Sequence, residues 1–324
     1  MRKAISLLLK AAVSGLLLYL ALRLVNLDTV AQRLRDVRIG WLALSVVILV
    51  GQTALLALRW QQIVRQCGAS MPFTRLFRFT MVGTFFNQTL PSSVGGDAMR
   101  IWLLGRQQDW RVASYSVLLD RLIGLVMLAC VVVVCLPWTF ALVQDPVGRI
   151  ALLAIGLGSL GGWVVFLVLG WERWRFLQRW SLTRHVAATA TVAIGILRAP
   201  RTLGTVTLIS VMSHMLTALC AWCVAHAVSA DLSFPNAIFV VLPVALIAVV
   251  PISIAGWGVR EGAMIAAFAY AGLPQSDGLL VSILFGVSYL VLGVLGGLVW
   301  VLGPQPAKAG EDREIVADGR VNPS

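Results

Sequence analysis

The chain has 324 residues, of which 59% are hydrophobic and only 12% are charged, and its mean hydropathy is +0.88. A soluble domain carries roughly a quarter charged residues, so this composition excludes an ordinary soluble enzyme and predicts an all-α polytopic membrane protein. The formal net charge of +12 does not indicate a nucleic-acid partner, because the cations lie in short segments between apolar runs, where they orient a chain in a bilayer.

Six apolar runs have the length of about 20 residues that a spanning helix needs. In chain order they are Ile5–Val25, Trp41–Trp60, Val117–Trp138, Ile150–Trp171, Leu203–Ser229 and Leu279–Leu302. We interpret the first run as a spanning helix, because no small-residue cleavage site of a signal peptide follows it. The stretches Arg59–Arg78, Arg100–Arg121 and Arg173–Arg201 are predicted to lie in cytoplasmic loops. Residues 1–302 are predicted to form one transmembrane domain, and residues 303–324 a disordered cytoplasmic tail.

Two further apolar regions, Phe77–Leu104 and Ala237–Ala271, are interrupted by proline and glycine. Each half of such a region is too short to cross a bilayer of about 30 Å at about 1.5 Å per residue. We therefore predict two re-entrant hairpins, each made of two half-helices that meet inside the protein. A single crossing with a kink is the alternative for each region.

The two breaks carry the same short motif. Pro91–Arg100 and Pro251–Arg260 share proline, serine, a β-branched residue, glycine and arginine at equal offsets. Paired helix breaks in two halves of a chain indicate the substrate site of a transporter. If both termini are cytoplasmic and both regions re-enter, most of the 26 Lys and Arg residues fall inside. The predicted fold is then an inverted repeat, with halves of about residues 1–140 and 149–302, each a helix, a helix, a re-entrant hairpin and a helix.

Several ionisable residues lie within or beside the apolar regions, where an unpaired charge costs several kcal/mol. Asp120 and Arg121 have the alternative of snorkelling near a helix end, and Arg260 and Glu261 that of a local structural pair. We favour a functional role for Arg100 and Arg260, because each follows a break. There the next half-helix would direct its free N–H groups and positive dipole end at a cavity.

Glycine and serine complete the predicted substrate-binding set. Glycine lets the backbone approach a ligand and serine donates a hydrogen bond, so that with arginine they suit a phosphate. The acidic members would orient the arginines, contact an amine or sugar on the headgroup, or carry a coupled proton. The set comprises Ser93, Gly95, Gly96, Asp97, Arg100, Asp120, Arg121, Ser253, Gly256, Gly258, Arg260 and Glu261.

The sequence contains no Walker A loop, Gly-x-Ser-x-Gly elbow or zincin motif. The three histidines lack metal-ligand spacing, and Cys220 and Cys223 lie in the middle of an apolar run, where we expect them in the core. We therefore predict no catalytic residue, no metal site and no cofactor, and we expect that the chain is not an enzyme.

At these motifs the chain resembles the lysylphosphatidylglycerol synthase transmembrane family, the flippase-like region of proteins that make and flip aminoacylated phosphatidylglycerol. The resemblance rests on Phe85–Pro91 followed by Gly95-Gly96-Asp97-x-x-Arg100, on Leu119–Gly124 and on Pro251–Gly262, and it extends from about Ile5 to Leu302. It implies lipid translocation in a bacterial plasma or inner membrane, with Asp97, Arg100, Asp120, Arg121, Arg260 and Glu261 as motif positions. In those proteins a soluble synthase domain follows, so we do not expect synthase activity here.

The predicted function is that of a lipid flippase, which moves an anionic phospholipid or polyprenyl-phosphate-linked lipid between leaflets. The alternative is an accessory or catalytic membrane subunit in lipid glycosylation or aminoacylation that uses a carboxylate as a base. A third hypothesis is an ion or small-solute transporter. The expected partners are the membrane lipid and a lipid-modifying enzyme.

Overall fold

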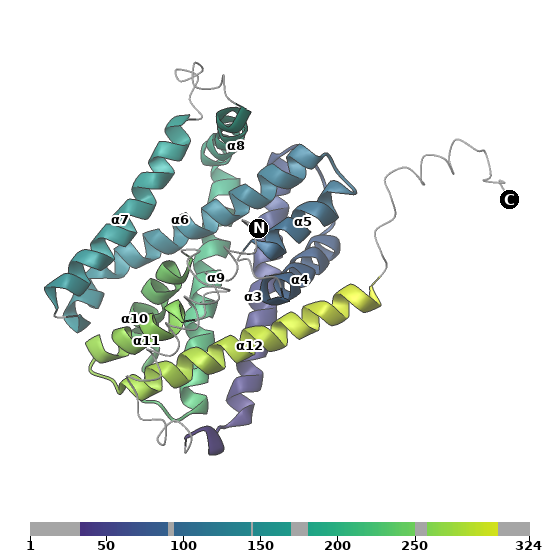
Figure 1. The fold of residues 1–324 in the computed structure, drawn as a ribbon. Coiled ribbons are helices and arrows are strands. Elements are labelled where there is room, and N and C mark those ends of the chain that lie inside the picture. The colour runs from purple at the N-terminus through teal and green to yellow at the C-terminus, as the bar shows by residue number, and fades with distance from the viewer. Residues whose placement is uncertain (1–32, 90–93, 144, 170–180, 250–257, 304–324) are drawn as a thin grey trace, which may run out of the picture.

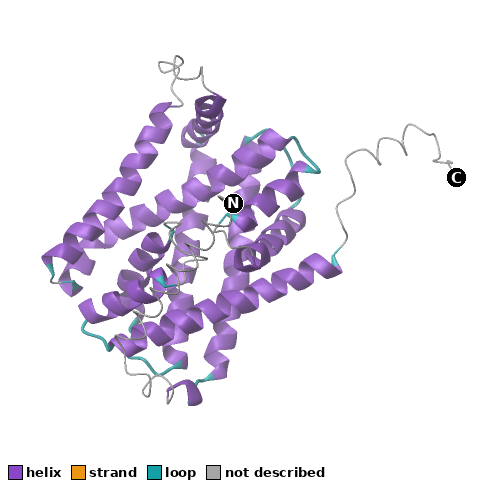
Figure 2. Cartoon of the chain, in the orientation of Figure 1, coloured by secondary structure: helices purple, strands orange, loops and turns teal. Residues whose placement is uncertain are grey.

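The computed structural model describes residues 33–89, 94–143, 145–169, 181–249 and 258–303. All regular secondary structure in these ranges is helical (Figure 2). Five of the described helices are long and apolar enough to cross a membrane. The chain thus has the all-α, polytopic membrane fold that its composition predicts. The first predicted span, Ile5–Val25, lies outside the described residues.

Each of the five long helices begins before its predicted apolar run, and two of them end two residues before that run ends. The five helices are α3 (Ile39–Gln66), α6 (Trp110–Leu142), α7 (Pro146–Leu169), α9 (Pro200–Ala227) and α12 (Gln275–Leu302). α6 begins seven residues before its apolar run and α3 ends six residues after its own, so polar residues predicted near helix ends lie well inside these helices. α9 starts at Pro200. Proline is tolerated there because the N–H of the first helical residue has no partner within the helix in any case.

The first broken region folds into α4 (Phe73–Thr89) and α5 (Gly95–Gly105), which we call hairpin 1. The two helices run antiparallel, because contacts join both ends of the pair. Near the open end, Arg75 Nη1 donates to Gln107 Oε1 at 3.2 Å, and near the break, Gly96 N donates to Asn87 Oδ1 at 2.8 Å. A single kinked crossing would separate Arg75 from Gln107, so the prediction of a hairpin is confirmed for this region.

The second broken region contains α10 (Phe234–Ala248) and α11 (Val259–Tyr270), which pack on one another and which we call hairpin 2. Ser233 caps α10 by accepting a hydrogen bond from Asn236 N at 3.4 Å. α11 begins after Gly258, whose φ of 86° lies in the left-handed region that favours glycine. The breaks themselves, residues 90–93 and 250–257, lie outside the described residues.

Helices of the two halves pack in a symmetrical pattern around a central pair, α3 and α9, which lie side by side (Figure 1). α4 of hairpin 1 packs on α12, and α10 of hairpin 2 packs on α6; likewise α5 packs on α6, and α11 on α12. α9 begins at residue 200, 161 residues after α3 begins at residue 39, and α10 begins at residue 234, 161 after α4 at residue 73. We call α3 to α6 the first set of helices and α9 to α12 the second set. The same helix contacts recur when the two sets are exchanged.

Glycines on α12 allow its close contact with hairpin 1. A Cβ atom at Gly296 would overlap the backbone oxygen of Met81, and one at Gly297 would lie 2.9 Å from the ring of Phe85. Side chains at these positions would therefore push α4 away from α12. In the central pair, Cys220 and Cys223 of α9 are buried, as the sequence predicts.

One helix in the structure corrects the sequence analysis. α8 (Ser181–Arg198) occupies most of the second half of the predicted loop Arg173–Arg201, and it packs on α3, α6, α7 and α9. A stripe of small and aliphatic side chains on one face of α8 is buried, namely Ala187, Ala190, Ala193 and Ile196. The stripe is too short to cross a bilayer, so a search for spans of about 20 residues passes over it.

Candidate functional site

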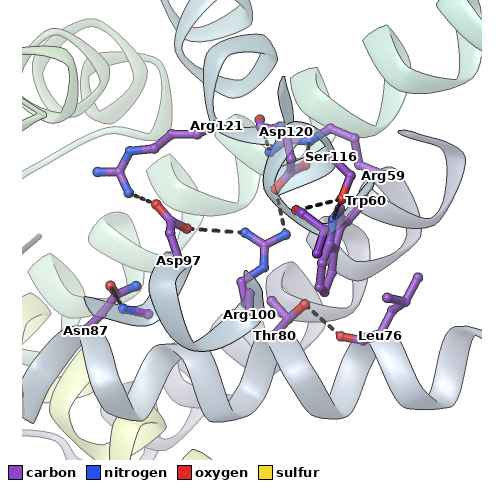
Figure 3. A network of polar contacts seen from close by, with 12 residues as sticks. Arg59, Trp60, Leu76, Thr80, Asn87, Asp97, Arg100, Ser116, Asp120 and Arg121 are labelled. Carbon is purple, nitrogen blue, oxygen red and sulfur yellow. Dashed lines mark hydrogen bonds and ion pairs between the residues drawn. The ribbon is translucent and has the colours of Figure 1, made fainter. Parts of the chain in front are cut away.

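Five charged residues meet beside hairpin 1 (Figure 3). α3 supplies Arg59, α5 supplies Asp97 and Arg100, and α6 supplies Asp120 and Arg121. All are almost fully buried except Arg121, whose side chain is 39% exposed. We call these five residues the hairpin 1 network. Buried charges at membrane depth persist only when they are paired, so the geometry of the pairs decides what the network can bind.

The carboxylate of Asp120 is held between two arginines. Its Oδ1 accepts from Arg59 Nε at 2.8 Å, and its Oδ2 accepts from Arg100 Nη2 at 2.9 Å. Arg59 Nη2 also donates to the backbone oxygen of Asp120 at 3.1 Å. Asp120 lies ten residues, or about 15 Å, inside α6 and is 3% exposed, so the snorkelling alternative is wrong for this residue.

Asp97 pairs with Arg100, which it shares with Asp120, and with Arg121. It lies in the first turn of α5, where the helix dipole favours a negative charge. Its Oδ1 accepts from Arg100 Nη1 at 3.5 Å, and its Oδ2 accepts a short hydrogen bond from Arg121 Nη1. Arg100 thus lies between the two carboxylates, and Arg121 extends from Asp97 toward the exposed side.

Among the described residues, the network contains three arginines and two carboxylates. These five residues together carry a net charge of +1 in a largely buried position. The Nε of Arg100 is buried and has no hydrogen-bond partner in the described part of the chain. The guanidinium lies over the ring of Trp60, 4.1 Å from its centroid, and Trp60 Nε1 donates to Ser116 Oγ at 3.1 Å, which fixes the ring. Such an arrangement is suited to an anion with several acceptor oxygens, such as a phosphate.

Gly96 has a structural role that the sequence analysis did not predict. A Cβ atom there would overlap the backbone oxygen of Gly83 and the side chain of Asn87. The close approach that this glycine permits is therefore between α5 and α4. Together with the bond from Gly96 N to Asn87, it sets where α5 begins and so where Asp97 and Arg100 lie.

The described part of hairpin 2 holds a different set of charges, one arginine and one carboxylate. Glu261 is fully buried, and its Oε2 accepts from Gly258 N at 2.6 Å, which caps the start of α11. Its Oε1 accepts from Arg260 Nη2 at 2.8 Å and from Ser282 Oγ at 2.9 Å. The local structural pair considered for Arg260 and Glu261 is thus present. We call Gly258, Arg260, Glu261 and Ser282 the hairpin 2 network.

The structure divides the predicted site residues into two groups. Asp97, Arg100, Asp120 and Arg121 come together at hairpin 1, with Gly95 and Gly96 at the start of the same α5. Gly258, Arg260 and Glu261 come together at hairpin 2. Ser93, Ser253 and Gly256 lie outside the described residues.

A stripe of buried polar side chains on α3 extends from the hairpin 1 network, to which Arg59 belongs, toward the start of α3. The stripe consists of Ser45, Gln52 and Arg59, spaced by seven residues, or two helical turns. In that order they bond to Ser288 Oγ at 2.8 Å, Thr217 Oγ1 at 2.7 Å and Ser210 Oγ at 3.2 Å. Each partner belongs to α9 or α12, so the stripe joins the two sets of helices.

Sequence reasoning missed Arg59 and Ser282 as members of the networks, and Trp60 and Ser116 as the residues beside Arg100. Arg59 lies next to the end of the apolar run Trp41–Trp60, and was therefore placed at the start of a loop. The available signal was the seven-residue spacing of polar residues within that run. It is visible in the printed sequence once the helix is continued to Gln66.

The family model described as the lysylphosphatidylglycerol synthase TM region matches residues 7–297. The chain belongs to this family. No curated protein matches it. The matched range contains both networks and every described helix up to the last turns of α12. Family and fold together establish a membrane protein of several spans that is related to lipids.

Proposed function

We propose that the chain moves an anionic lipid, a phospholipid or a polyprenyl-phosphate-linked lipid, between the leaflets of a membrane. The observation that carries this proposal is the buried Nε of Arg100, which has no hydrogen-bond partner in the described part of the chain, within a network of three arginines and two carboxylates. A phosphate that enters would balance the charge and accept hydrogen bonds from arginine. The lipid tails would remain in the hydrocarbon.

The depth of the two networks supports the predicted inverted repeat. Arg59 lies seven residues, or about 10 Å, from the C-terminal end of α3, and Ser282 lies about 10 Å from the N-terminal end of α12. The ion pair of 2.8 Å from Arg33 to Asp277 places the start of α12 beside the start of α3. The networks are thus displaced toward opposite ends of the bundle, as expected for hairpins that enter from opposite faces.

Charge at the two ends of the bundle supports an orientation. The end where α3 finishes carries Arg65, Arg75, Arg78, Arg106, Arg111, Arg198 and Arg201 against Asp109 among the described residues. The opposite end carries Arg33, Arg35, Arg38 and Arg149 against Asp36, Asp145, Asp231 and Asp277. By the positive-inside rule we propose that the first end faces the cytoplasm of a bacterial inner membrane, with both termini on that side.

The pairing of the acidic residues favours transport over the catalytic alternative. Both oxygens of Asp120 and both of Asp97 accept hydrogen bonds from arginines, so neither carboxylate is placed as a general base. In this proposal they hold the arginines in position, and rocking of one set of helices against the other gives alternating access. The chain is then not itself an enzyme, and a lipid-modifying enzyme that makes the substrate is its implied partner.

The test is leaflet exchange in vesicles that contain the reconstituted protein. Headgroup-labelled phosphatidylglycerol, phosphatidylcholine and a polyprenyl phosphate are supplied in turn, and a membrane-impermeant quencher reports the outer-leaflet fraction. We expect exchange of an anionic lipid by the wild type and its loss in Arg100→Gln and Arg121→Gln. The matched control is Arg111→Gln, because Arg111 is exposed at the start of α6. Folded wild-type protein that exchanges none of these lipids, but forms a modified lipid with a partner enzyme, would support the accessory-subunit hypothesis instead.

A further inference from the structure

An apolar groove lies between hairpin 2 and α6 and α7, with a volume of about 220 Å³. Its walls include Ala151 and Ile155 of α7, Val244 and Ile247 of α10, and Ala263 and Ala267 of α11. Thr139 and Tyr270 are the only residues with polar side chains in its lining. An apolar cavity of about 150 Å³ in another protein excludes water and takes up benzene, so a groove of this size and chemistry is suited to hydrocarbon.

Small residues keep the groove open. α11 presents Ala263, Ala266 and Ala267 to it, Ala271 follows directly after α11, and α7 presents Gly148 and Ala151. Larger side chains at these positions would fill the space between the two helices. The slot that remains is suited to a slender, flexible chain, whereas a bulky ring system would need a wider space.

In the part of the chain that the structure describes, the groove opens beside the exposed face of α7. α7 is a candidate span that is little buried, and its exposed side chains include Ile150, Val164 and Val165. Ala151 and Ala266 of the groove are themselves exposed. Because the bilayer core surrounds this surface, hydrocarbon chains are the molecules available at the mouth.

The groove follows hairpin 2 from its open end, at Phe239 and Tyr270, toward the break. At its inner end, Ala263 lies one helical turn after Arg260 of the hairpin 2 network. We propose that the groove binds one hydrocarbon chain, acyl or prenyl, of a membrane lipid. The inference rests on the proposed function only in taking this lipid to be the one that is translocated.

The test uses phosphatidylglycerol with a photoreactive diazirine near the end of one acyl chain, mixed into phosphatidylcholine vesicles with the reconstituted full-length protein. After illumination, labelled positions are mapped by mass spectrometry of peptides. We expect labelling of the groove residues of α10 and α11 above that of the exposed face of α7 at Val164 and Val165. Ala267→Phe should fill the groove and lower labelling there at least about fivefold, while the reference face is labelled as before.

Two matched controls separate filling of the groove from a general effect of an added ring. Ala269→Phe lies two residues further on α11, and Ala154→Phe lies one turn from Ala151 on α7; both positions are exposed and outside the groove. Ala151→Phe should reduce groove labelling as Ala267→Phe does, and neither control should. Equal labelling of groove and reference face in the wild type, or groove labelling that neither filling variant changes, would overturn the inference.

Failure of the inference can be told apart from failure of the proposed function. If the wild type exchanges lipid but its groove is not selectively labelled, the proposed function holds and the inference about the groove is rejected. If the groove is selectively labelled, Ala267→Phe abolishes this labelling and the protein exchanges no lipid, the groove is a lipid site and the proposed function is rejected. Size-exclusion profiles of each variant in detergent confirm that only folded protein is compared.

Discussion

Arg59 on α3 and Asp120 on α6 are 61 residues apart in the sequence, and an ion pair of 2.8 Å between Nε and Oδ1 joins them in the interior. The same guanidinium reaches Ser210 of α9 at 3.2 Å. The side chain of Arg59 therefore connects Asp120, which pairs with Arg100, to α9. The position of the hairpin 1 network is thus coupled to the packing of α3 on α9.

Replacing Arg59 by alanine should destabilise the protein strongly, because it leaves a buried carboxylate with fewer partners. Breaking a buried ion pair by removing one member typically costs about 3–5 kcal/mol. Thermal unfolding in detergent measures the effect, and Arg65→Ala, at the exposed end of the same helix, is the control. The double variant Arg59→Ala with Asp120→Ala should lose less than the sum of the two single losses. Additive losses would contradict the coupling.

Replacing Gly96 by alanine should displace α5 from α4, because the new methyl group overlaps backbone and side-chain atoms of α4. Overpacking of this kind costs about 1–3 kcal/mol, and the shift would also move Asp97 and Arg100. Gly262→Ala is the control, since it lies within α11 with no atom close to the added methyl and should be neutral or slightly stabilising. Unfolding temperature and leaflet exchange measure the two effects. A stable Gly96→Ala protein with full exchange would disprove the role of the close contact.

The two networks should respond differently to loss of their charges. Arg260→Gln combined with Glu261→Gln removes a balanced pair and keeps groups that can bond to Ser282 and cap α11. We expect lipid exchange within about threefold of the wild type for this double variant. Arg100→Gln should reduce exchange by at least about tenfold, which corresponds to roughly 1.4 kcal/mol. Equal losses in both variants would show that the two breaks contribute alike to the site.

Cys67 provides a prediction about pH. It follows the end of α3, outside the spanning segments, and burial raises the pKa of its thiol to about 11. Because the thiolate is the reactive form, Cys67 should react slowly with a maleimide at neutral pH. Its rate should rise about tenfold for each unit toward pH 10. The measurement uses a variant in which Cys67 is the single cysteine. A rate that is already maximal near pH 9 would contradict a raised pKa.

The sequence was sufficient for features that depend on local composition. Runs of apolar residues predicted the spans that fall within the described residues, and proline and glycine in such runs predicted hairpin 1, because half-helices of that length cannot cross a bilayer. The search for runs long enough to span a bilayer also explains why α8 was missed, because the apolar stripe of α8 is shorter than a span. The motif positions predicted four of the five charged residues that meet at hairpin 1, and Arg59 was missed.

Contacts between helices were beyond reach of the sequence. That Arg59, Trp60 and Ser116 surround Arg100 and Asp120 depends on how α3 lies against α6, and no local pattern specifies this. The sequence also did not show that the charged residues beside the two breaks are paired in different ways. It arises because Glu261 bonds to Gly258 and Arg260 on its own helix, whereas Asp120 bonds to arginines on α3 and α5.

Each hairpin rests on the last helix of the other set, α4 on α12 and α10 on α6. A chain of half this length would contain one hairpin and one last helix, but it would lack the helix on which that hairpin packs here. Such a half-length chain is expected to fold only when the other half supplies the helix that covers its hairpin. Co-expression of two fragments divided in the short connection between α6 and α7 should therefore restore a folded protein, whereas neither fragment alone should persist in the membrane.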